Sequence, residues 1–257
     1  METAVPDMEL FSSHIPKIRK FLESRPGRKT FQARLSCSWP KGSGKDVVLM
    51  GDVGVELGSP ETESCSVLLW TEDASLVRDG TVTLIGPDLP EARQKSMAFG
   101  KIVLLHVEGF TEENTFHRYR EMEQMRFLLD LKGYMLRAAS QYQREWCRVS
   151  RDALEKGFCI SILGSSLVRL FRELDYCKGM EIIFITEDRN TIREVREMTR
   201  DTSRIIAAMN KMADEMSFDC DECDYRDVCD DADYLKKMRT VYRRKTTGEK
   251  SWVRHGS

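Results

Sequence analysis

The sequence predicts an α+β fold, in which a mixed sheet with packed helices is followed by a small helical, cysteine-rich metal-binding segment. Short runs rich in Val, Ile and Leu alternate with glycine-containing turns between residues 47 and 107, which is typical of sheet strands. Longer segments elsewhere carry apolar residues at helical spacing. Three closely spaced cysteines follow a long charged segment near the end of the chain.

The first predicted elements are a helix at residues 15–22, an interruption at residues 25–28 and a basic loop at residues 39–46. This loop is similar to a phosphate-binding loop, but Trp39 and Asp46 stand where that motif requires a glycine and a hydroxyl residue. The pair Asp79 and Gly80 suits a hairpin turn, because both residues tolerate a positive φ. Predicted strands lie at residues 47–50, 66–70, 81–85 and 102–107.

Helices dominate the second half of the chain. A hydroxyl and two carboxylates at residues 111–113 predict a helix start, and apolar spacing extends this helix to about residue 142. A strand is predicted at residues 146–150. Ser150, at its end, is the expected N-cap of a short helix, and Gly157 can terminate that helix. The remaining predictions are helices at residues 151–156, 165–174, 188–216 and 230–243, a strand at residues 180–186 and a disordered tail at residues 246–257.

Composition and charge limit the classes of function. The 257 residues are enough for one large domain or two smaller ones. The 40 basic and 42 acidic side chains give a net charge of -2, which argues against nucleic acid or a membrane surface as a partner. We find no run of about 18 apolar residues and no charged-then-apolar leader, so we expect a cytoplasmic protein.

The clearest candidate for a metal site is the pattern Cys-x2-Cys-x5-Cys formed by Cys220, Cys223 and Cys229. Two cysteines three positions apart can place both sulfurs on one metal ion or cluster edge, and the third closes the loop. Such a site needs a fourth ligand, or it keeps one position open. The candidates are a non-cysteine group and the isolated cysteines Cys65, Cys147, Cys159 and Cys177.

Eight Asp and Glu residues lie between positions 219 and 233, around the three thiols. Carboxylates this close raise the pKa of a bare thiol, whereas a bound cation stabilises the thiolate and offsets the acidic charge. The segment therefore favours a bound metal ion or iron–sulfur cluster over the alternative of ordinary reduced thiols in an acidic, solvated loop. Zinc is the alternative to a cluster.

Four strings of the sequence together resemble one family, the β subunit of the carbon monoxide dehydrogenase/acetyl-CoA synthase complex. The resemblance covers roughly residues 46–188 and is to the middle α+β domain of that protein. The strings are GVELGSP at residues 54–60, DGTVTLIGPDL at residues 79–89, WCRVS at residues 146–150 and ALEKGF at residues 153–158.

In that family the next domain carries a nickel and iron–sulfur cluster, where carbon monoxide, a methyl group from a corrinoid protein and coenzyme A become acetyl-CoA. Cys220 and Cys223 match the first cysteine pair of that cluster, but Cys229 follows too closely and no Cys-Gly-Cys tripeptide comes after it. The resemblance therefore implies a truncated paralogue with a simpler metal site. It also implies that Trp146 and Arg148 lie where the family's middle domain meets coenzyme A.

These observations predict four parts: an N-terminal helical or extended segment (1–45), an acetyl-CoA-synthase-like α+β domain (46–187), a segment with the long helix, cysteine loop and C-terminal helix (188–245), and a tail (246–257). We expect an iron–sulfur protein of one-carbon and acetyl-CoA metabolism in an anaerobe. It would work beside another subunit of a carbon monoxide dehydrogenase/corrinoid-type complex and would not form acetyl-CoA unaided. The alternatives are a non-enzymatic interaction module with structural zinc, and an electron-transfer or metal-delivery partner.

Overall fold

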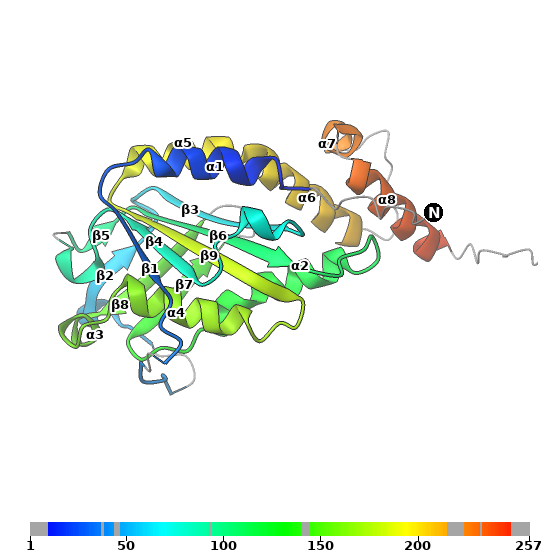
Figure 1. The fold of residues 1–257 in the computed structure, drawn as a ribbon. Coiled ribbons are helices and arrows are strands. Elements are labelled where there is room, and N and C mark those ends of the chain that lie inside the picture. The colour runs from blue at the N-terminus through cyan, green and yellow to red at the C-terminus, as the bar shows by residue number, and fades with distance from the viewer. Residues whose placement is uncertain are drawn as a thin grey trace, which may run out of the picture.

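The larger of two mixed sheets forms the centre of the molecule (Figure 1). The computed structural model describes residues 10–36, 39–43, 47–92, 94–139, 144–214, 224–231 and 233–247. The large sheet has the strand order β1-β4-β9-β6-β3, in which β1/β4 and β6/β9 are antiparallel and β4/β9 and β3/β6 are parallel. Its strands are β1 (Arg28–Gln32), β3 (Ser64–Thr71), β4 (Thr81–Ile85), β6 (Phe99–Val107) and β9 (Cys177–Thr186).

The small sheet stands at one end of the large one and has the strand order β5-β2-β8-β7. β8 is antiparallel to both of its neighbours, β2 and β7, while β5 runs parallel to β2. The strands are β2 (Val53–Leu57), β5 (Ser96–Met97), β7 (Tyr134–Ala139) and β8 (Glu145–Ser150).

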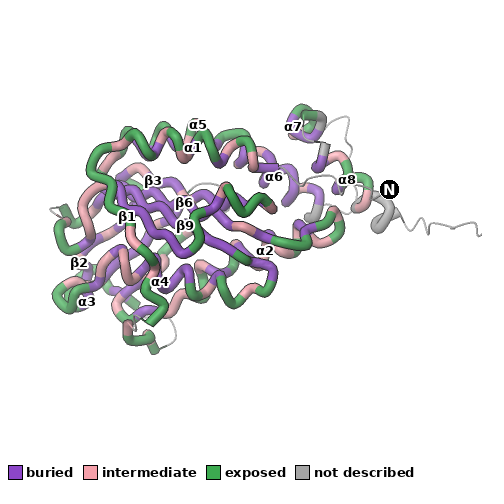
Figure 2. Tube along the Cα trace, in the orientation of Figure 1, coloured by how far each residue is buried: buried purple, intermediate pink, exposed green. Residues whose placement is uncertain are grey.

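Helices cover both faces of the large sheet, so that β3, β4, β6 and β9 are almost wholly buried, whereas the edge strand β1 is largely exposed (Figure 2). Helices α1 (His14–Glu23) and α5 (Arg189–Met198) lie above the sheet in Figure 1, and α5 packs on β3 and β6. Helix α4 (Ile160–Phe171) packs below it on β4 and β9, and α2 (Thr115–Gln124) lies on the same side. Helix α3 (Arg151–Glu155) follows the small sheet, and 3-10 helices are Met50–Asp52, Ala74–Leu76, Leu89–Glu91 and Met125–Phe127.

The last three helices form a small group at the far end of the large sheet. Helix α6 (Arg200–Asp214) contacts both α7 (Arg226–Asp231) and α8 (Asp233–Thr247). Arg204 of α6 donates two hydrogen bonds to the carboxylate of Asp227, at 2.8 and 2.7 Å. The hydroxyl groups of Tyr234 on α8 and Thr115 on α2 are 2.7 Å apart. These contacts attach the end of the cysteine-rich segment to the body of the protein.

The predicted α+β class, with a mixed sheet and packed helices, is confirmed. The strand at residues 81–85 has the expected bounds, and the strands at 66–70, 102–107 and 180–186 lie inside longer observed ones. The side chain of Ser150 accepts a hydrogen bond from the backbone N–H of Ala153, and Gly157 has a φ of 90°. The expected strand, cap and short helix are therefore present.

The helix predicted at residues 111–142 is wrong in its second half. Helix α2 and its 3-10 extension end at Phe127, and residues 134–139 form β7. Gly133 separates the two elements with a φ of 77°, and an added Cβ there would lie 2.5 Å from the Ser150 hydroxyl oxygen. Pairing with β8 decides the conformation of this segment, because its apolar residues satisfy a strand as well as a helix.

Other predicted elements also differ from the structure, and the helix expected at residues 165–174 runs instead from Ile160 to Phe171. The strand expected at residues 47–50 begins at Val53 instead, after a 3-10 turn. Gly80 forms a turn with a φ of 68°, but no hairpin exists there because β4 pairs with β1 and β9. The helix expected at residues 188–216 is divided at Thr199, whose hydroxyl donates to the carbonyl of Val195. The helix expected at residues 230–243 overlaps two helices, α7 and α8, and α8 continues to Thr247.

Among the described residues, every helix is too short or too polar to cross a membrane.

Candidate ligand-binding site

Strand β8 carries alternate side chains on the two faces of the small sheet. The inward face packs on the large sheet, with β3 in contact with β8. The residues between the inward-facing ones point to the outer face, where β8 provides an aromatic ring, a guanidinium and a hydroxyl within five positions. The inward residues are Glu145, Cys147 and Val149, and the outward residues are Trp146, Arg148 and Ser150.

Glu145 fixes the start of β8 against the large sheet. Its carboxylate forms an ion pair with Lys101 of β6, and both side chains are almost completely buried. The same carboxylate accepts a hydrogen bond from the hydroxyl of Ser66 at 3.2 Å, and the backbone carbonyl of Glu145 accepts from Ser64 at 2.8 Å. These bonds hold Trp146, the next residue, at a defined position on the outer face.

Trp146 is half-buried and lies between two arginines. The guanidinium carbon of Arg137, on β7, is 5.0 Å from the centroid of the indole ring, and that of Arg148 is 5.5 Å from it. Such distances allow cation–π attraction. The indole Nε1 is buried, and no hydrogen-bond acceptor for it is found in the described part of the chain.

A pocket of about 310 Å³ lies beside Trp146. Arg144 is the charged residue of its lining, and its guanidinium points to the carbonyls of Ser59 and Thr62 at 3.4 and 3.3 Å. Gly58 has a φ of 64°, and an added Cβ would lie 2.3 Å from the carbonyl oxygen of Glu145, so only glycine allows β2 to end here. The lining residues are Gly58, Pro60, Ala138, Ala139, Arg144 and Trp146.

Arg148 is buried and already holds a counter-ion. Its Nε donates to the carboxylate of Glu56 on β2 at 2.6 Å, and its Nη1 donates to the carbonyl of Val48 at 3.4 Å. The positive charges exposed on this face belong to Arg137 and Arg144. Sequence reasoning missed both, since residue 137 was assigned to a helix. Strand alternation alone would not have placed Arg137, because the register of β7 shifts between Leu136, which pairs with Cys147, and Ala138, which pairs with Trp146.

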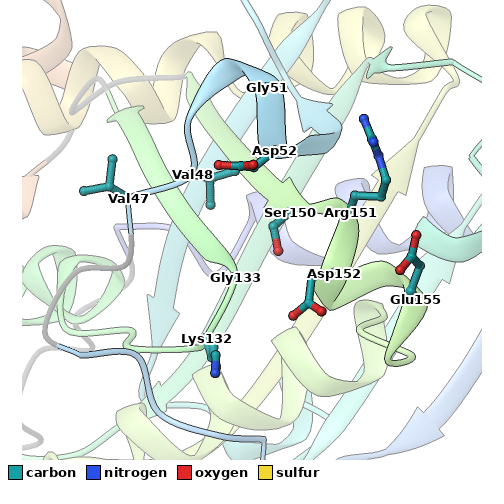
Figure 3. A pocket seen from close by; sticks show the side chains of 10 residues that line it. All are labelled: Val47, Val48, Gly51, Asp52, Lys132, Gly133, Ser150, Arg151, Asp152 and Glu155. Atoms are coloured by element: carbon teal, nitrogen blue, oxygen red, sulfur yellow. The ribbon is translucent and has the colours of Figure 1, made fainter.

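A second pocket, of about 420 Å³, opens at the other end of β8 (Figure 3). Ser150 lies at its centre, between the 47–52 loop and the start of α3. The lining carries three carboxylates and two cationic groups, and one of the carboxylates, Asp152, also pairs with Lys156 at 2.7 Å. The residues are Val47, Val48, Gly51, Asp52, Lys132, Gly133, Ser150, Arg151, Asp152 and Glu155.

The structure describes one of the three predicted metal ligands. Cys229 lies on α7 with 5% of its surface exposed, and its backbone N–H donates to the carbonyl of Tyr225 at 3.0 Å. Cys220 and Cys223 lie outside the described residues. Within the described part of the chain, no group of three or more His, Cys, Asp or Glu side chains is placed to hold a metal ion. The site at Cys220, Cys223 and Cys229 stays a prediction.

Three of the cysteines considered as a fourth ligand belong to the core of the sheets. Burial raises the pKa of the Cys65 and Cys177 thiols to about 12. Burial also raises the pKa of the Cys147 thiol, whose sulfur is 3.0 Å from the hydroxyl oxygen of Tyr134. Cys159 is half-buried at the start of α4. The first three are protonated at neutral pH and pack as small apolar side chains.

The smaller sheet of this α+β domain thus displays an aromatic ring and two exposed arginines beside a pocket. Residues 41–191, more than half of the chain, match the family model described as CO dehydrogenase/acetyl-CoA synthase complex beta subunit. The chain belongs to this family.

Curated relatives support the same assignment. The acetyl-CoA decarbonylase/synthase complex subunit beta of Archaeoglobus fulgidus is 30% identical over 139 residues, which are 53% of this chain and 26% of that protein. The subunit beta 2 of Methanosarcina thermophila is 26% identical over 144 residues, 56% of this chain and 30% of that protein. The subunit beta of Methanopyrus kandleri is 27% identical over 152 residues, 58% of this chain and 32% of that protein. The matched segment thus spans a quarter to a third of each relative.

Proposed function

We propose that this chain is a coenzyme A-binding subunit that acts in one-carbon and acetyl-CoA metabolism beside another subunit of a carbon monoxide dehydrogenase/corrinoid-type complex. The observation that carries the proposal is the Trp146 surface, which lies within the segment shared with the beta subunits. The family membership supports the metabolic setting. An acyltransferase activity would belong to the assembled complex.

The outer face of the small sheet suits a nucleotide with several phosphates. The indole of Trp146 offers a flat apolar surface for adenine, and stacking of a base on an aromatic ring is worth about 1–3 kcal/mol. Arg137 and Arg144 supply the exposed guanidinium groups that phosphates prefer. Arg148 has a different role, because its charge is balanced by Glu56: it supports the indole ring from within the sheet.

The proposal includes a metal centre at Cys220, Cys223 and Cys229, with an iron–sulfur cluster as the leading assignment and structural zinc as the alternative. The donor set supports it, because three closely spaced thiolates suit either group. Cys229 is held on a short helix that is attached to α6 through Asp227 and Arg204. When bound, a cluster would supply electron transfer, whereas zinc would only stabilise this end of the chain.

Replacing Trp146 with alanine is expected to weaken coenzyme A binding by about 1–3 kcal/mol, or roughly 5- to 150-fold in Kd, because the stacking surface for adenine is lost. Isothermal titration calorimetry of the full chain measures this change. Phe127→Ala is the matched control, since Phe127 is also exposed but lines neither pocket. Equal affinities in the wild type and Trp146→Ala would contradict the proposal.

The double substitution Arg137→Gln and Arg144→Gln is expected to raise the Kd for coenzyme A about tenfold and to flatten its dependence on salt. Both changes follow from removal of the two exposed charges that would meet phosphates, since screening by salt acts on such contacts. Titrations at low and high ionic strength measure the slope. Arg200→Gln is the control, because Arg200 is an exposed arginine on α6. If the double variant and this control show the same slope, the arginines do not contact the ligand.

A further inference from the structure

The two pockets of the small sheet lie at opposite ends of one strand. Trp146 lines the first pocket and Ser150 lines the second, and both residues have the outward parity of β8. Four steps along a strand correspond to about 13 Å. A ligand that occupies both pockets must therefore be elongated, and it must lie along β8.

Continuous contacts join the two pockets. Arg148 faces the indole of Trp146 on one side, and on the other it donates to the carbonyl of Val48, which lines the second pocket. The same guanidinium lies against the sulfur of Met50. Leu49 and Met50 are 62% and 69% exposed, so the loop that covers Arg148 presents apolar side chains to solvent. This loop provides an apolar surface between the pockets.

The charges of the two ends differ, and this difference orients the ligand. Arg144 and the nearby Arg137 make the Trp146 end positive. At the Ser150 end, three carboxylates are matched by three cationic groups, because Lys156 pairs with Asp152 at 2.7 Å beside Lys132 and Arg151 of the lining. Phosphate groups are therefore attracted more strongly to the first end than to the second.

We propose that coenzyme A binds across the outer face of β8 and the loop that covers its middle, with the nucleotide at Trp146 and the pantetheine arm in the pocket at Ser150. This inference rests on the proposed function and adds the direction of the ligand. The arm carries amides, a hydroxyl and two methyl groups. The second pocket offers matching chemistry in the apolar Val47 and Val48 and in the polar Ser150 and Lys132.

Gly51 allows a selective test, because it lines the second pocket and an added Cβ would meet no atom within 4 Å. Gly51→Phe would fill the pocket, and Gly51→Ala is the matched control with too small a side chain to do so. The probes are coenzyme A and adenosine 3′,5′-bisphosphate, which shares the nucleotide end but lacks the arm. Each is titrated into the full chain by calorimetry, and thermal unfolding confirms that the variants are folded.

The wild type and Gly51→Ala are expected to bind coenzyme A about tenfold more tightly than the bisphosphate. Gly51→Phe is expected to remove this difference and to leave the Kd for the bisphosphate unchanged. The inference is overturned if the wild type binds both probes equally, or if Gly51→Phe keeps the tenfold preference. Failure of the wild type to bind either probe would instead overturn the proposed function.

Discussion

Replacing Lys101 with methionine is expected to lower the free energy of unfolding by about 3–5 kcal/mol, because it leaves the carboxylate of Glu145 buried without a counter-charge. Both side chains are at most 5% exposed, and the pair joins β6 of the large sheet to β8 of the small one. Burial already raises the pKa of the neighbouring Glu123, so this region has little capacity to accept an unpaired negative charge. Urea denaturation followed by circular dichroism measures the loss.

A double variant separates the ion pair from simple packing. Lys101→Met combined with Glu145→Gln removes both charges, and it is expected to recover a large part of the stability lost in Lys101→Met alone. The exposed pair Lys156 and Asp152 serves as the control, since both side chains are more than 60% exposed and Lys156→Met should cost less than about 1 kcal/mol. Equal losses for Lys101→Met and Lys156→Met would refute the role given to the buried pair.

Replacing Cys220, Cys223 and Cys229 together with serine is expected to abolish the bound metal. A serine hydroxyl does not ionise near neutral pH, so it cannot replace a thiolate ligand. Anaerobic purification followed by metal and acid-labile sulfide analysis measures the content. Iron and sulfide in the wild type identify a cluster, whereas zinc without sulfide identifies a structural site.

Cys37→Ser is the matched control for this experiment, because Cys37 is outside the motif and is not one of the candidate ligands. It is expected to keep the metal content of the wild type. A wild-type chain without metal, or a triple variant with undiminished metal, would contradict the metal centre.

Local sequence signals predicted the structure correctly where the conformation of an element depends on neighbouring residues in the sequence. The cap at Ser150 and the strand at residues 81–85 depend on short-range chemistry, and both are present, whereas Gly80 forms a turn but not the expected hairpin. The segment at residues 134–139 was mistaken for a helix because its apolar residues fit both periodicities. Its strand conformation depends on pairing with β8, whose partner residues lie 6 to 15 positions later in the sequence.

The candidate site shows the same division between local and long-range information. The resemblance of the WCRVS string to the family pointed to Trp146, and the structure places this residue beside a pocket. The burial of Arg148 could not be predicted, since its partner Glu56 is distant in sequence and meets it only when β2 pairs with β8. Arg137 reaches Trp146 through the pairing of β7 with β8.

The most direct test of the coenzyme A site is the nuclear magnetic resonance signal of the Trp146 indole N–H. The chain has four tryptophans, and the indole signal that is missing from the spectrum of Trp146→Phe is the signal of Trp146. Titration with coenzyme A is expected to shift the Trp146 signal in a saturable way, because the bound ligand would cover the indole ring that carries this N–H. If coenzyme A saturates the protein while this signal does not move, the ligand binds elsewhere and the outer face of the small sheet is not its site.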